Sequence, residues 1–364
     1  MYRRQQAFAV GIATASLLAV MLMAGCSNSG GTPAASSPEP TAVLGGAGST
    51  FIAPLMTKWI GAYQQAHPSV QVNYRPTGSG GGIQELKKGY LSFSASDAPL
   101  SDEQMKEMSP IVQVPGSAGP VCLVYNLPKL TAPLKLSAKT LSDIFLGNVI
   151  SWQDPAIARD NPGVSLPRAA VILVHRSDGS GTTYIMTSYL SKVSQDWQER
   201  SGEGTSVPWP VGIGADGSKG ILAIVKGTPG TIGYVELNYA KANGLAIASI
   251  QNQAGRYVQP TVLSAAAAIN AFSADLDKDV RAPIVNPPAS AADAYPICGL
   301  TFVLIPRDRA DAGQQAAVKD FIGFAISSGQ DSAEELSYAK LPASVQKQGK
   351  TLLAQLTVNG VPLK

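Results

Sequence analysis

Three short segments of the sequence combine glycine with a hydroxyl side chain just before an expected helix. The first four backbone amides of a helix have no acceptor inside the helix, and the helix dipole places about half a positive charge there. Glycine also lets a ligand approach the backbone closely. Each segment is therefore a candidate anion cradle, although the same residues also serve as ordinary helix caps. In chain order, the first, second and third cradles are Gly48-Ser49-Thr50, Gly78-Ser79-Gly80 and Gly179-Ser180-Gly181-Thr182.

Arg176 lies just before the third cradle and carries a full positive charge. Its planar guanidinium presents several N–H donors that match the oxygens of an oxyanion. Asp178 could lie on the same side and hold the guanidinium in place; the alternative is a surface ion pair of little energetic value. Three cradles and one arginine in the same chain predict a binding site for an oxyanion.

The segments that must position these residues alternate between strand-like and helix-like patterns, which is typical of an α/β protein. Apolar residues from Ile52 to Tyr63 recur at helical spacing and predict one face of an amphipathic helix. Strands are expected at 42–44, 70–74, 91–95 and 170–174, and helices over 52–63, from 83, from 184 and over 344–356. Each cradle then follows a strand and precedes a helix.

The N-terminus has the organisation of an export signal. Arg3 and Arg4 precede an apolar stretch from Ala7 to Met23, which is followed by Ala24-Gly25-Cys26. A cysteine directly after Ala-Gly resembles a bacterial lipobox, so we expect residues 1–25 to be a lipoprotein signal peptide and Cys26 to be acylated. The alternative is an ordinary signal peptide with a chance cysteine. Residues 26–43 would form a flexible tether from a membrane lipid, in the cell envelope and facing the periplasm or the cell exterior.

The composition excludes several classes of function. Charged residues make up 15% of the 364 residues, and the formal net charge is +3, with two of the arginines in the expected signal peptide. Nucleic-acid binding would need a clustered basic face, which the sequence lacks, so we expect no nucleic-acid partner. No His, Asp or Glu cluster has metal-ligand spacing, and we expect neither a metal nor a cofactor. The length favours two domains.

Two cysteines remain once Cys26 is set aside. Cys122 and Cys298 each lie in an apolar run of strand character. An exported chain meets oxidising conditions, so a disulfide between them is favoured over two buried free thiols. If the two strands are neighbours, the disulfide would lie close to the point where the chain crosses between its two expected domains.

Taken together, these residues resemble a known family, the phosphate-binding proteins (PstS family) of bacterial phosphate-specific ABC transporters. The resemblance covers nearly the whole chain from Leu44 onward. It rests mainly on four strings, namely Gly46-Ala47-Gly48-Ser49-Thr50-Phe51, Gly78-Ser79-Gly80-Gly81, Ala95-Ser96-Asp97-Ala98-Pro99-Leu100 and Asp178-Gly179-Ser180-Gly181-Thr182. Gly82, directly after the second string, departs from the family pattern.

The resemblance implies a fold, a function and a set of site residues. The fold is the two-lobed α/β architecture of periplasmic binding proteins (type II), with mixed sheets, flanking helices and a hinge. Lobe one would comprise 44–126 and 294–364, and lobe two 127–293. The expected function is capture of inorganic phosphate by a monomer that delivers it to permease and ATPase subunits. The implied phosphate ligands are Thr50, Phe51, Ser79, Asp97, Arg176, Ser180, Gly181 and Thr182, with Asp178 in support.

Asp97 has a physical role in such a site. Inorganic phosphate keeps at least one proton at neutral pH, and a carboxylate can accept a charge-assisted hydrogen bond from its P–OH group. Sulfate keeps no proton, so its oxygens would face the carboxylate without a hydrogen between them. Asp97 is therefore expected to select phosphate over sulfate. The alternative is that Asp97 merely caps the turn before Pro99.

Three further functions stay open. An exported phosphatase or serine hydrolase would use Ser180 or Ser79 as nucleophile, but neither lies in Gly-x-Ser-x-Gly. His175 should also point opposite to Arg176 on a strand, so it is poorly placed as a base. We therefore expect no enzyme. The second is a binding protein for another tetrahedral oxyanion, and the third is a phosphate sensor without a transporter.

Overall fold

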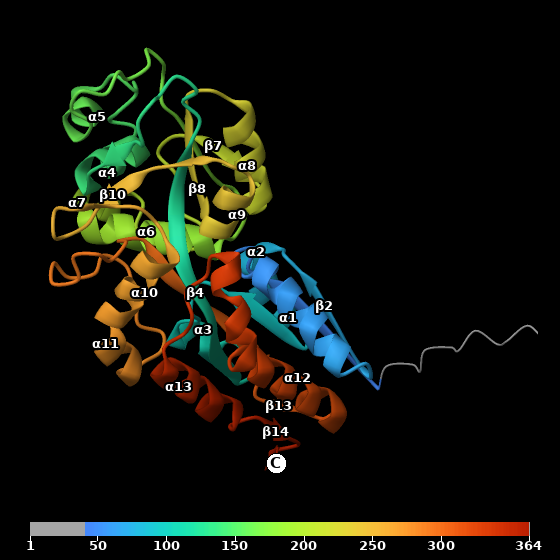
Figure 1. The fold of residues 1–364 in the computed structure, drawn as a ribbon. Helices are drawn as coiled ribbons and strands as arrows, with labels where there is room; N and C mark the ends of the chain where they lie inside the picture. Colours follow the sequence, from blue (N-terminus) through green and yellow to red (C-terminus); the bar gives the residue numbers. More distant parts are fainter. Residues whose placement is uncertain (1–40, 364) are drawn as a thin grey trace, which may run out of the picture. The chain divides into compact units, whose positions relative to one another are not determined.

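The computed structural model describes residues 41–363, and the largest of their β-sheets is mixed, with helices on both faces (Figure 1). β9 (Ala246–Ile247) pairs with β4 beside the main path of the sheet. Along that path the strands follow the order β2 (Val70–Arg75), β1 (Ala42–Gly48), β3 (Phe93–Ser96), β12 (Cys298–Pro306), β4 (Ile111–Tyr125), β8 (Thr231–Glu236), β6 (Ile172–Arg176) and β7 (Ile213–Ala215).

The long strand β4 joins two halves of this sheet. Its first part pairs antiparallel with β12, and its last part, 121–125, pairs antiparallel with β8. We call β2, β1, β3 and β12 the first half, and β8, β6, β7 and β9 the second half. Figure 1 shows β4 running from the helices around the first half to those around the second.

The strand directions bring the carboxyl ends of both halves together. β12 is antiparallel to both β3 and β4, so β3 and its parallel neighbour β1 run in the direction of β4. β8 and its parallel neighbour β6 run against β4. The end of β3 therefore lies level with Pro115 of β4, and the end of β8 lies beside Val121. Ligands of α/β sheets bind beyond the carboxyl ends of parallel strands, and here two such edges face each other.

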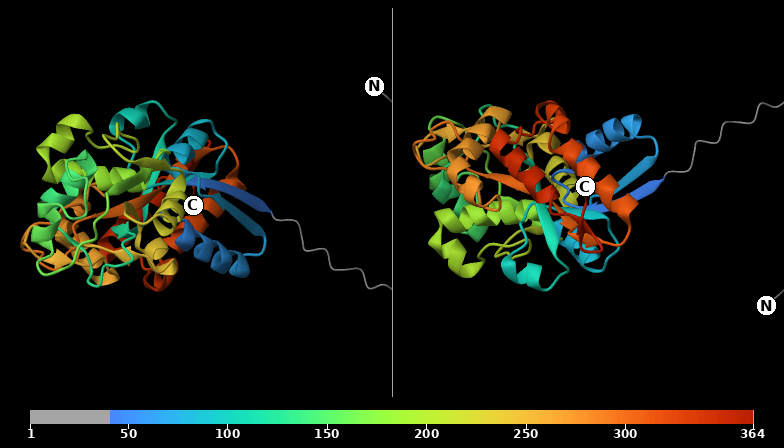
Figure 2. Two further views of the ribbon diagram at one scale, coloured as in Figure 1. Left: turned by 90° about the horizontal axis from the view of Figure 1, so that it is seen from above. Right: turned by 90° about the horizontal axis from the view of Figure 1, so that it is seen from below.

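Helices cover both faces of the first half. Phe93 packs against Phe321 of α12 (Ala312–Ala325), with ring centroids 5.9 Å apart, next to α1 (Ala53–Ala66). The following residue, Ser94, points to the opposite face, where it meets Gly82 of α2 (Gly78–Lys87). Successive strand residues alternate between faces, so this pair of contacts places α12 and α2 on opposite sides. Figure 2 shows the same layering from above and below.

The second half has the same construction. Gly233 of β8 faces Ile221 of α8 (Gly217–Gly227). The next residue, Tyr234, faces α6 (Gly181–Val193), where its hydroxyl lies 2.6 Å from the hydroxyl of Thr183. Both α6 and α8 begin at the carboxyl edge of the sheet, so their N-termini point to the junction between the halves.

The remaining elements complete the core. α10 (Val262–Ala271) and α11 (Ser273–Lys278), which the sequence analysis placed in lobe two, contact β4, β12 and α13 (Ala343–Leu353). None of the helices within residues 41–363 is long and apolar enough to cross a membrane. The other elements are α3 (Asp102–Lys106), α4 (Ala138–Leu146), α5 (Pro155–Asp160), α7 (Gln195–Arg200), α9 (Leu237–Ala242), the sheet β5 (Lys135–Leu136), β10 (Ser249–Gln251) and β11 (Tyr257–Val258), and the sheet β13 (Asp308–Arg309), β14 (Thr357–Val358) and β15 (Val361–Pro362).

The expected elements are present, with one clear difference at α2. A helix was expected from residue 83, but α2 begins at Gly78, so the second cradle forms its first turn. Glycine is unfavourable within a helix, and here close packing requires it. A Cβ on Gly82 would lie 2.5 Å from the Cα of Gly48 in β1.

At the N-terminus, β1 already begins at Ala42, whereas the signal peptide and Cys26 lie outside the described residues.

Cys122 and Cys298 are both free and buried, which corrects the favoured expectation of a disulfide. Cys298 lies opposite Pro120 in the β12–β4 pair, so Cys122 is two residues further along the neighbouring strand. Such diagonal neighbours are about 7–8 Å apart. Disulfides usually need Cα atoms within about 6.8 Å of each other. Burial raises the pKa of both thiols, which keeps them protonated.

We predict opposite effects for alanine at two helical glycines. Gly82→Ala should lower the free energy of unfolding by about 2 kcal/mol, because its Cβ meets backbone that cannot move aside. Gly61→Ala is the matched control in α1, where a Cβ meets no atom within 4 Å, and it should raise the free energy of unfolding by up to about 1 kcal/mol. Urea denaturation measures both values. Equal effects of the two substitutions would contradict the proposed packing of α2 on β1.

Candidate functional site

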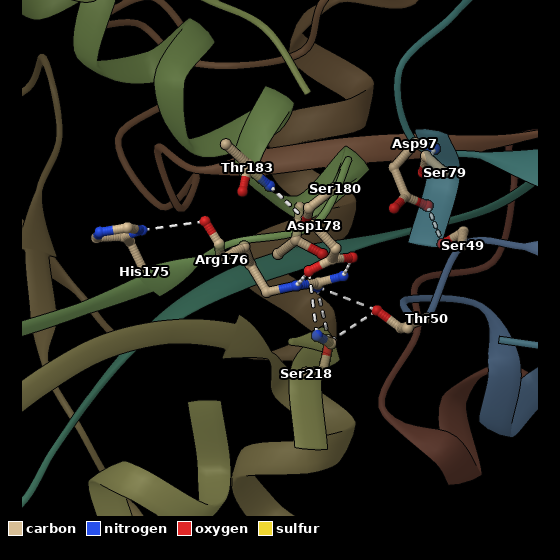
Figure 3. A network of polar contacts seen from close by, with 12 residues as sticks. Ser49, Thr50, Ser79, Asp97, His175, Arg176, Asp178, Ser180, Thr183 and Ser218 are labelled. Carbon is tan, nitrogen blue, oxygen red and sulfur yellow. Dashed lines mark hydrogen bonds and ion pairs between the residues drawn. The ribbon is translucent and has the colours of Figure 1, made fainter. Parts of the chain in front are cut away.

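Arg176, the last residue of β6, forms a buried ion pair with Asp178. Its Nε donates to Oδ1 at 2.6 Å and its Nη2 to Oδ2 at 2.5 Å, and the two side chains are 1% and 14% exposed (Figure 3). Burial alone would raise the pKa of the Asp178 carboxyl, but the hydrogen bonds and charge of Arg176 outweigh burial and lower it. The structure thus confirms that Asp178 holds the guanidinium, and excludes the surface ion pair.

The third nitrogen of the guanidinium connects the two halves of the sheet. Nη1 of Arg176 donates to Thr50 Oγ1 and to Ser218 Oγ, each at 3.2 Å. Thr50 follows β1 in the first half, whereas Ser218 lies in the first turn of α8 in the second half. The hydroxyls of Thr50 and Ser218 are 2.9 Å apart and share a hydrogen bond. Arg176 therefore links segments 126 residues apart in the chain.

Asp97 lies just beyond β3, in the first half, and its carboxylate faces this region. Ser49 and Thr301 both donate to its Oδ1, at 2.6 and 2.7 Å, so the side chain is held by hydroxyls and does not act as a turn cap. Oδ2 lies beside Gly181, where a Cβ would come within 2.5 Å of it. Burial, more than any other influence, raises the pKa of Asp97 to about 7, although the bonds from Ser49 and Thr301 oppose the shift.

The three cradles meet at the junction of the halves. The amide of Gly80 in the second cradle donates to the carbonyl of Gly179 in the third, at 2.8 Å. A Cβ on Gly181 would lie 2.4 Å from Ser79 Oγ, and one on Gly78 would lie 2.4 Å from Asp178 Oδ2. Glycine at these positions therefore allows the backbones of the two halves to touch. Figure 3 shows Ser79 and Asp97 facing Ser180 and Arg176 across the junction.

Several hydrogen-bond donors of the cradles are left available by their local bonds. Ser79 Oγ accepts from the amide of Asp97 and Ser180 Oγ from the amide of Thr183, so both hydroxyl hydrogens are free to donate elsewhere. Gly181 and Thr182 supply the first two amides of α6, which have no acceptor within the helix. Phe51 follows Thr50 in the first cradle's loop, and its carbonyl accepts from Tyr338, which fixes the loop.

The site residues are almost completely buried. The exposed fractions are 7% or less for Thr50, Phe51, Ser79, Asp97, Arg176, Ser180 and Thr182. Hydrogen bonds and charges act strongly in such a low-dielectric environment. The arrangement offers many donors, one arginine and the Asp97 carboxylate, which suits an oxyanion that carries a proton. Within the described part of the chain, no group of three or more His, Cys, Asp or Glu residues could hold a metal ion.

His175 points away from the site, as the strand alternation predicts. Its ring stacks on Trp209, with centroids 4.6 Å apart. Its Nδ1 lies 3.0 Å from the carbonyl of Arg176 (Figure 3). Burial lowers the pKa of the imidazole, so the ring is mostly neutral at neutral pH. This placement leaves the hydroxyls of Ser79 and Ser180 without His175 as a base.

Four residues of the network were not predicted as site residues. Ser49 belongs to the first cradle but was not assigned a role, and Thr301 is the one hydroxyl within an apolar strand. Ser218 follows Asp216-Gly217 at the start of α8, a fourth Gly-Ser helix start that could have been recognised. Glu236, the last residue of β8, accepts from Thr182 Oγ1 at 2.6 Å and from Ser218 Oγ at 3.0 Å, contacts that no local pattern in the sequence indicates.

We predict opposite pH effects on stability for the two aspartates. The pKa of Asp97 is about 7 in the folded protein and near 3.8 when exposed, so Asp97 lowers stability progressively as pH rises from 4 to 7. Asp97→Asn should therefore raise the free energy of unfolding at pH 8, by at most about 4 kcal/mol, with no gain near pH 4. Asp178 has a lowered pKa, and Asp178→Asn should instead destabilise the protein by about 3 kcal/mol at neutral pH.

Thermal unfolding of both variants without phosphate, between pH 2 and pH 8, measures these effects. The difference for Asp178→Asn should shrink as the pH falls below about 4, since the wild-type carboxyl then becomes protonated. An Asp97→Asn variant that is less stable than wild type at pH 8 would show that Asp97 is not a strained buried charge.

Comparison with known proteins places the chain in a family. Residues 35–328 match the family model of the PBP superfamily domain. A phosphate-binding protein PstS of Xylella fastidiosa (strain Temecula1) is 40% identical over 318 residues, which cover 87% of this chain and 86% of the relative. The phosphate-binding protein PstS of Pasteurella multocida is 42% identical over 311 residues, which cover 84% of this chain and 89% of the relative.

A solved structure supports the fold. A high affinity periplasmic phosphate-binding protein bound with phosphate is similar to this chain with a TM-score of 0.66 and 19% identity, over 88% of this chain and 98% of its own. At this identity the likeness concerns the fold alone, and it confirms the two-lobed type II architecture that the sequence predicted. With the family model and both relatives matching most of its length, the chain belongs to the PstS family of phosphate-binding proteins.

Proposed function

We propose that this chain binds one inorganic phosphate ion at the junction of the two halves and delivers it to an ABC-type importer. The observation that carries the proposal is the buried carboxylate of Asp97, which faces a set of free donors and the guanidinium of Arg176. An anion site with an acceptor at its centre suits a ligand that is both negatively charged and protonated. Inorganic phosphate has both properties at neutral pH.

The site distinguishes phosphate from tetrahedral anions without a proton, such as sulfate, by this acceptor. Asp97 Oδ1 is already occupied by two hydroxyl donors, whereas Oδ2 lies beside Gly181 at the third cradle. A P–OH group placed there donates to Oδ2. Sulfate has no hydrogen to donate, so its oxygen would meet a buried carboxylate oxygen directly, and this repulsion disfavours binding.

The proposed phosphate ligands are the residues inferred from the sequence. The amides of Thr50 and Phe51 and the hydroxyl of Ser79 act from the first half. Arg176, held by Asp178, and the start of α6 act from the second half. Because each half supplies part of the set of hydrogen-bond donors, all of them can contact one phosphate only when the two halves close around it. The complete set is Thr50, Phe51, Ser79, Asp97, Arg176, Ser180, Gly181 and Thr182.

The division into lobes belongs to this proposal. Lobe one consists of 44–126 and 294–364, and lobe two of 127–293, with the two crossovers between these segments acting as the hinge. The bond from Gly80 to Gly179 and the contacts of Thr50 with Arg176 and Ser218 then represent the closed state. The packing of α10 on β4 and β12 suggests that the second crossover lies closer to residue 262 than to 294.

We further propose where the protein works. Acylation at Cys26 would anchor a monomer to a membrane in the cell envelope, with the binding lobes facing the periplasm or the cell exterior. There it would pass phosphate to permease and ATPase subunits of a phosphate transporter. The role is binding and not catalysis, since His175 points away from the serine hydroxyls.

Isothermal titration with phosphate, arsenate and sulfate tests the function. We expect one phosphate per chain, competition by arsenate and none by sulfate at equal concentration. A well-folded sample that does not bind phosphate would exclude the proposal, and binding of sulfate instead would favour a different oxyanion. Turnover of a chromogenic phosphate ester would favour an exported phosphatase.

We predict that the rejection of sulfate weakens as the pH falls. Below about pH 7 the Asp97 carboxyl becomes protonated, because burial raises its pKa to about 7, and it can then donate to a sulfate oxygen. The apparent affinity for sulfate, in competition with phosphate, should increase roughly tenfold per pH unit as the pH falls from 9 to 7, and it should level off below pH 7, where the carboxyl is already protonated. Asp97→Asn should bind sulfate equally at all these pH values. A wild-type affinity for sulfate that does not change with pH would contradict the role of Asp97.

We predict that Arg176→Ala weakens phosphate binding by at least about a hundredfold, because a buried charged donor is lost and Asp178 loses its partner. Arg256→Ala is the control, since its ion pair with Asp293 is exposed and surface pairs contribute little. Titration calorimetry, with circular dichroism to verify folding, measures both. Equal losses in the two variants would indicate a general electrostatic effect and no specific contact of Arg176 with phosphate.

A further inference from the structure

Glu236, the last residue of β8, is a buried carboxylate at the edge of the site. Its side chain belongs to a residue only 1% exposed, and it does not cap the following helix, α9. Oε1 accepts from Thr182 Oγ1 at 2.6 Å and from Ser218 Oγ at 3.0 Å. Oε2 has no hydrogen-bond partner within residues 41–363. A buried carboxylate oxygen without a partner is costly, so a structural role alone does not explain Glu236.

The two partners of Glu236 both belong to the anion site. Thr182 is part of the third cradle, and Ser218 accepts from Arg176 Nη1 and contacts Thr50. The charge of Glu236 also acts on Arg176 and Asp97, where it raises both pKa values. Arg176 is already paired with Asp178. Glu236 therefore adds a negative charge to the site, and the guanidinium of Arg176 does not fully compensate for this charge.

The hydrogen bonds of Glu236 also fix the direction of two hydroxyls. Because Thr182 and Ser218 donate their hydrogens to Oε1, their oxygen lone pairs are left for other partners. Ser218 uses this capacity to accept from Arg176. The hydroxyl of Thr182, at the start of α6, is in the same way oriented as an acceptor.

We infer that Glu236 is a second selectivity residue of this site, which disfavours oxyanions without a proton through its charge and through the orientation of Thr182. This inference rests on the proposed phosphate function and deepens it. A P–OH group can donate to the oriented oxygen of Thr182, and this bond offsets the repulsion by Glu236. An anion such as sulfate meets the same repulsion without the compensating bond. Glu236 acts through its charge and through Thr182, without a direct contact to the ligand, and is a positioning residue.

Glu236→Gln tests the inference, because glutamine keeps the acceptor oxygen and the shape and removes only the charge. The ratio of the sulfate to the phosphate dissociation constant, measured by competition at pH 8, should fall about tenfold. Glu236→Asp restores the charge and should restore most of the ratio. Glu107→Gln is the matched control, since this side chain is 69% exposed in an ion pair with Lys87, and its ratio should equal that of wild type.

The outcomes separate this inference from the proposed function. A wild-type protein that does not bind phosphate refutes both. Normal phosphate binding with an unchanged ratio in Glu236→Gln refutes the selectivity role alone, and an equal loss of affinity for both anions shows that Glu236 is only structural. If Glu236→Gln does not fold, Thr182→Val removes the oriented hydroxyl instead. It should weaken phosphate more than sulfate, and an equal loss would overturn the inference.

Discussion

The long strand β4 pairs with one strand along its first part and with another along its last part, and the position of the whole site depends on this arrangement. Since β12 lies beside its first part and β8 beside its last, the parallel strands on the two sides run in opposite directions. Their carboxyl ends therefore point toward the same few residues of β4, between Pro115 and Val121. Any side chain placed just after β1, β3, β6 or β8 comes to this junction. Residues far apart in the chain can thus surround one small ligand without a long loop to carry them.

The electrostatics of the junction follow from this crowding. Two aspartates and a glutamate lie close to one arginine in a region that excludes water. Buried charges of this kind are unfavourable unless hydroxyls and amides satisfy them. Ser49, Thr301, Ser218 and Thr182 supply these bonds, each to a carboxylate oxygen. The protein therefore tolerates an excess of negative charge at an anion site, and a ligand that carries its own proton is the natural complement.

The sequence predicted the local features of the site well and the long-range ones poorly. The cradles, the strands before them and the pairing of Arg176 with Asp178 depend on neighbouring residues, and the structure places them as expected. The bond from Thr301 to Asp97 spans 204 residues, and nothing in an apolar strand indicates which partner its hydroxyl will meet. The start of α2 was misplaced because five residues with four glycines resemble a turn, although packing against β1 makes them helical. The expectation of a disulfide was wrong for a similar reason, since the register between two strands cannot be derived from composition.

The glycines at the junction have a consequence for the size of the ligand. Gly80 and Gly179 meet backbone to backbone, with no side chain between the two halves at this point, and the Gly80 amide already bonds to the Gly179 carbonyl. The distance of closest approach is therefore set by the polypeptide backbone, which is far stiffer than any side chain. A larger anion could not be accommodated by a change of rotamer; it would have to separate the halves and break that bond. The backbone contact thus limits the diameter of the ligand. Bulky phosphate esters would be excluded by their size alone, whatever their charge.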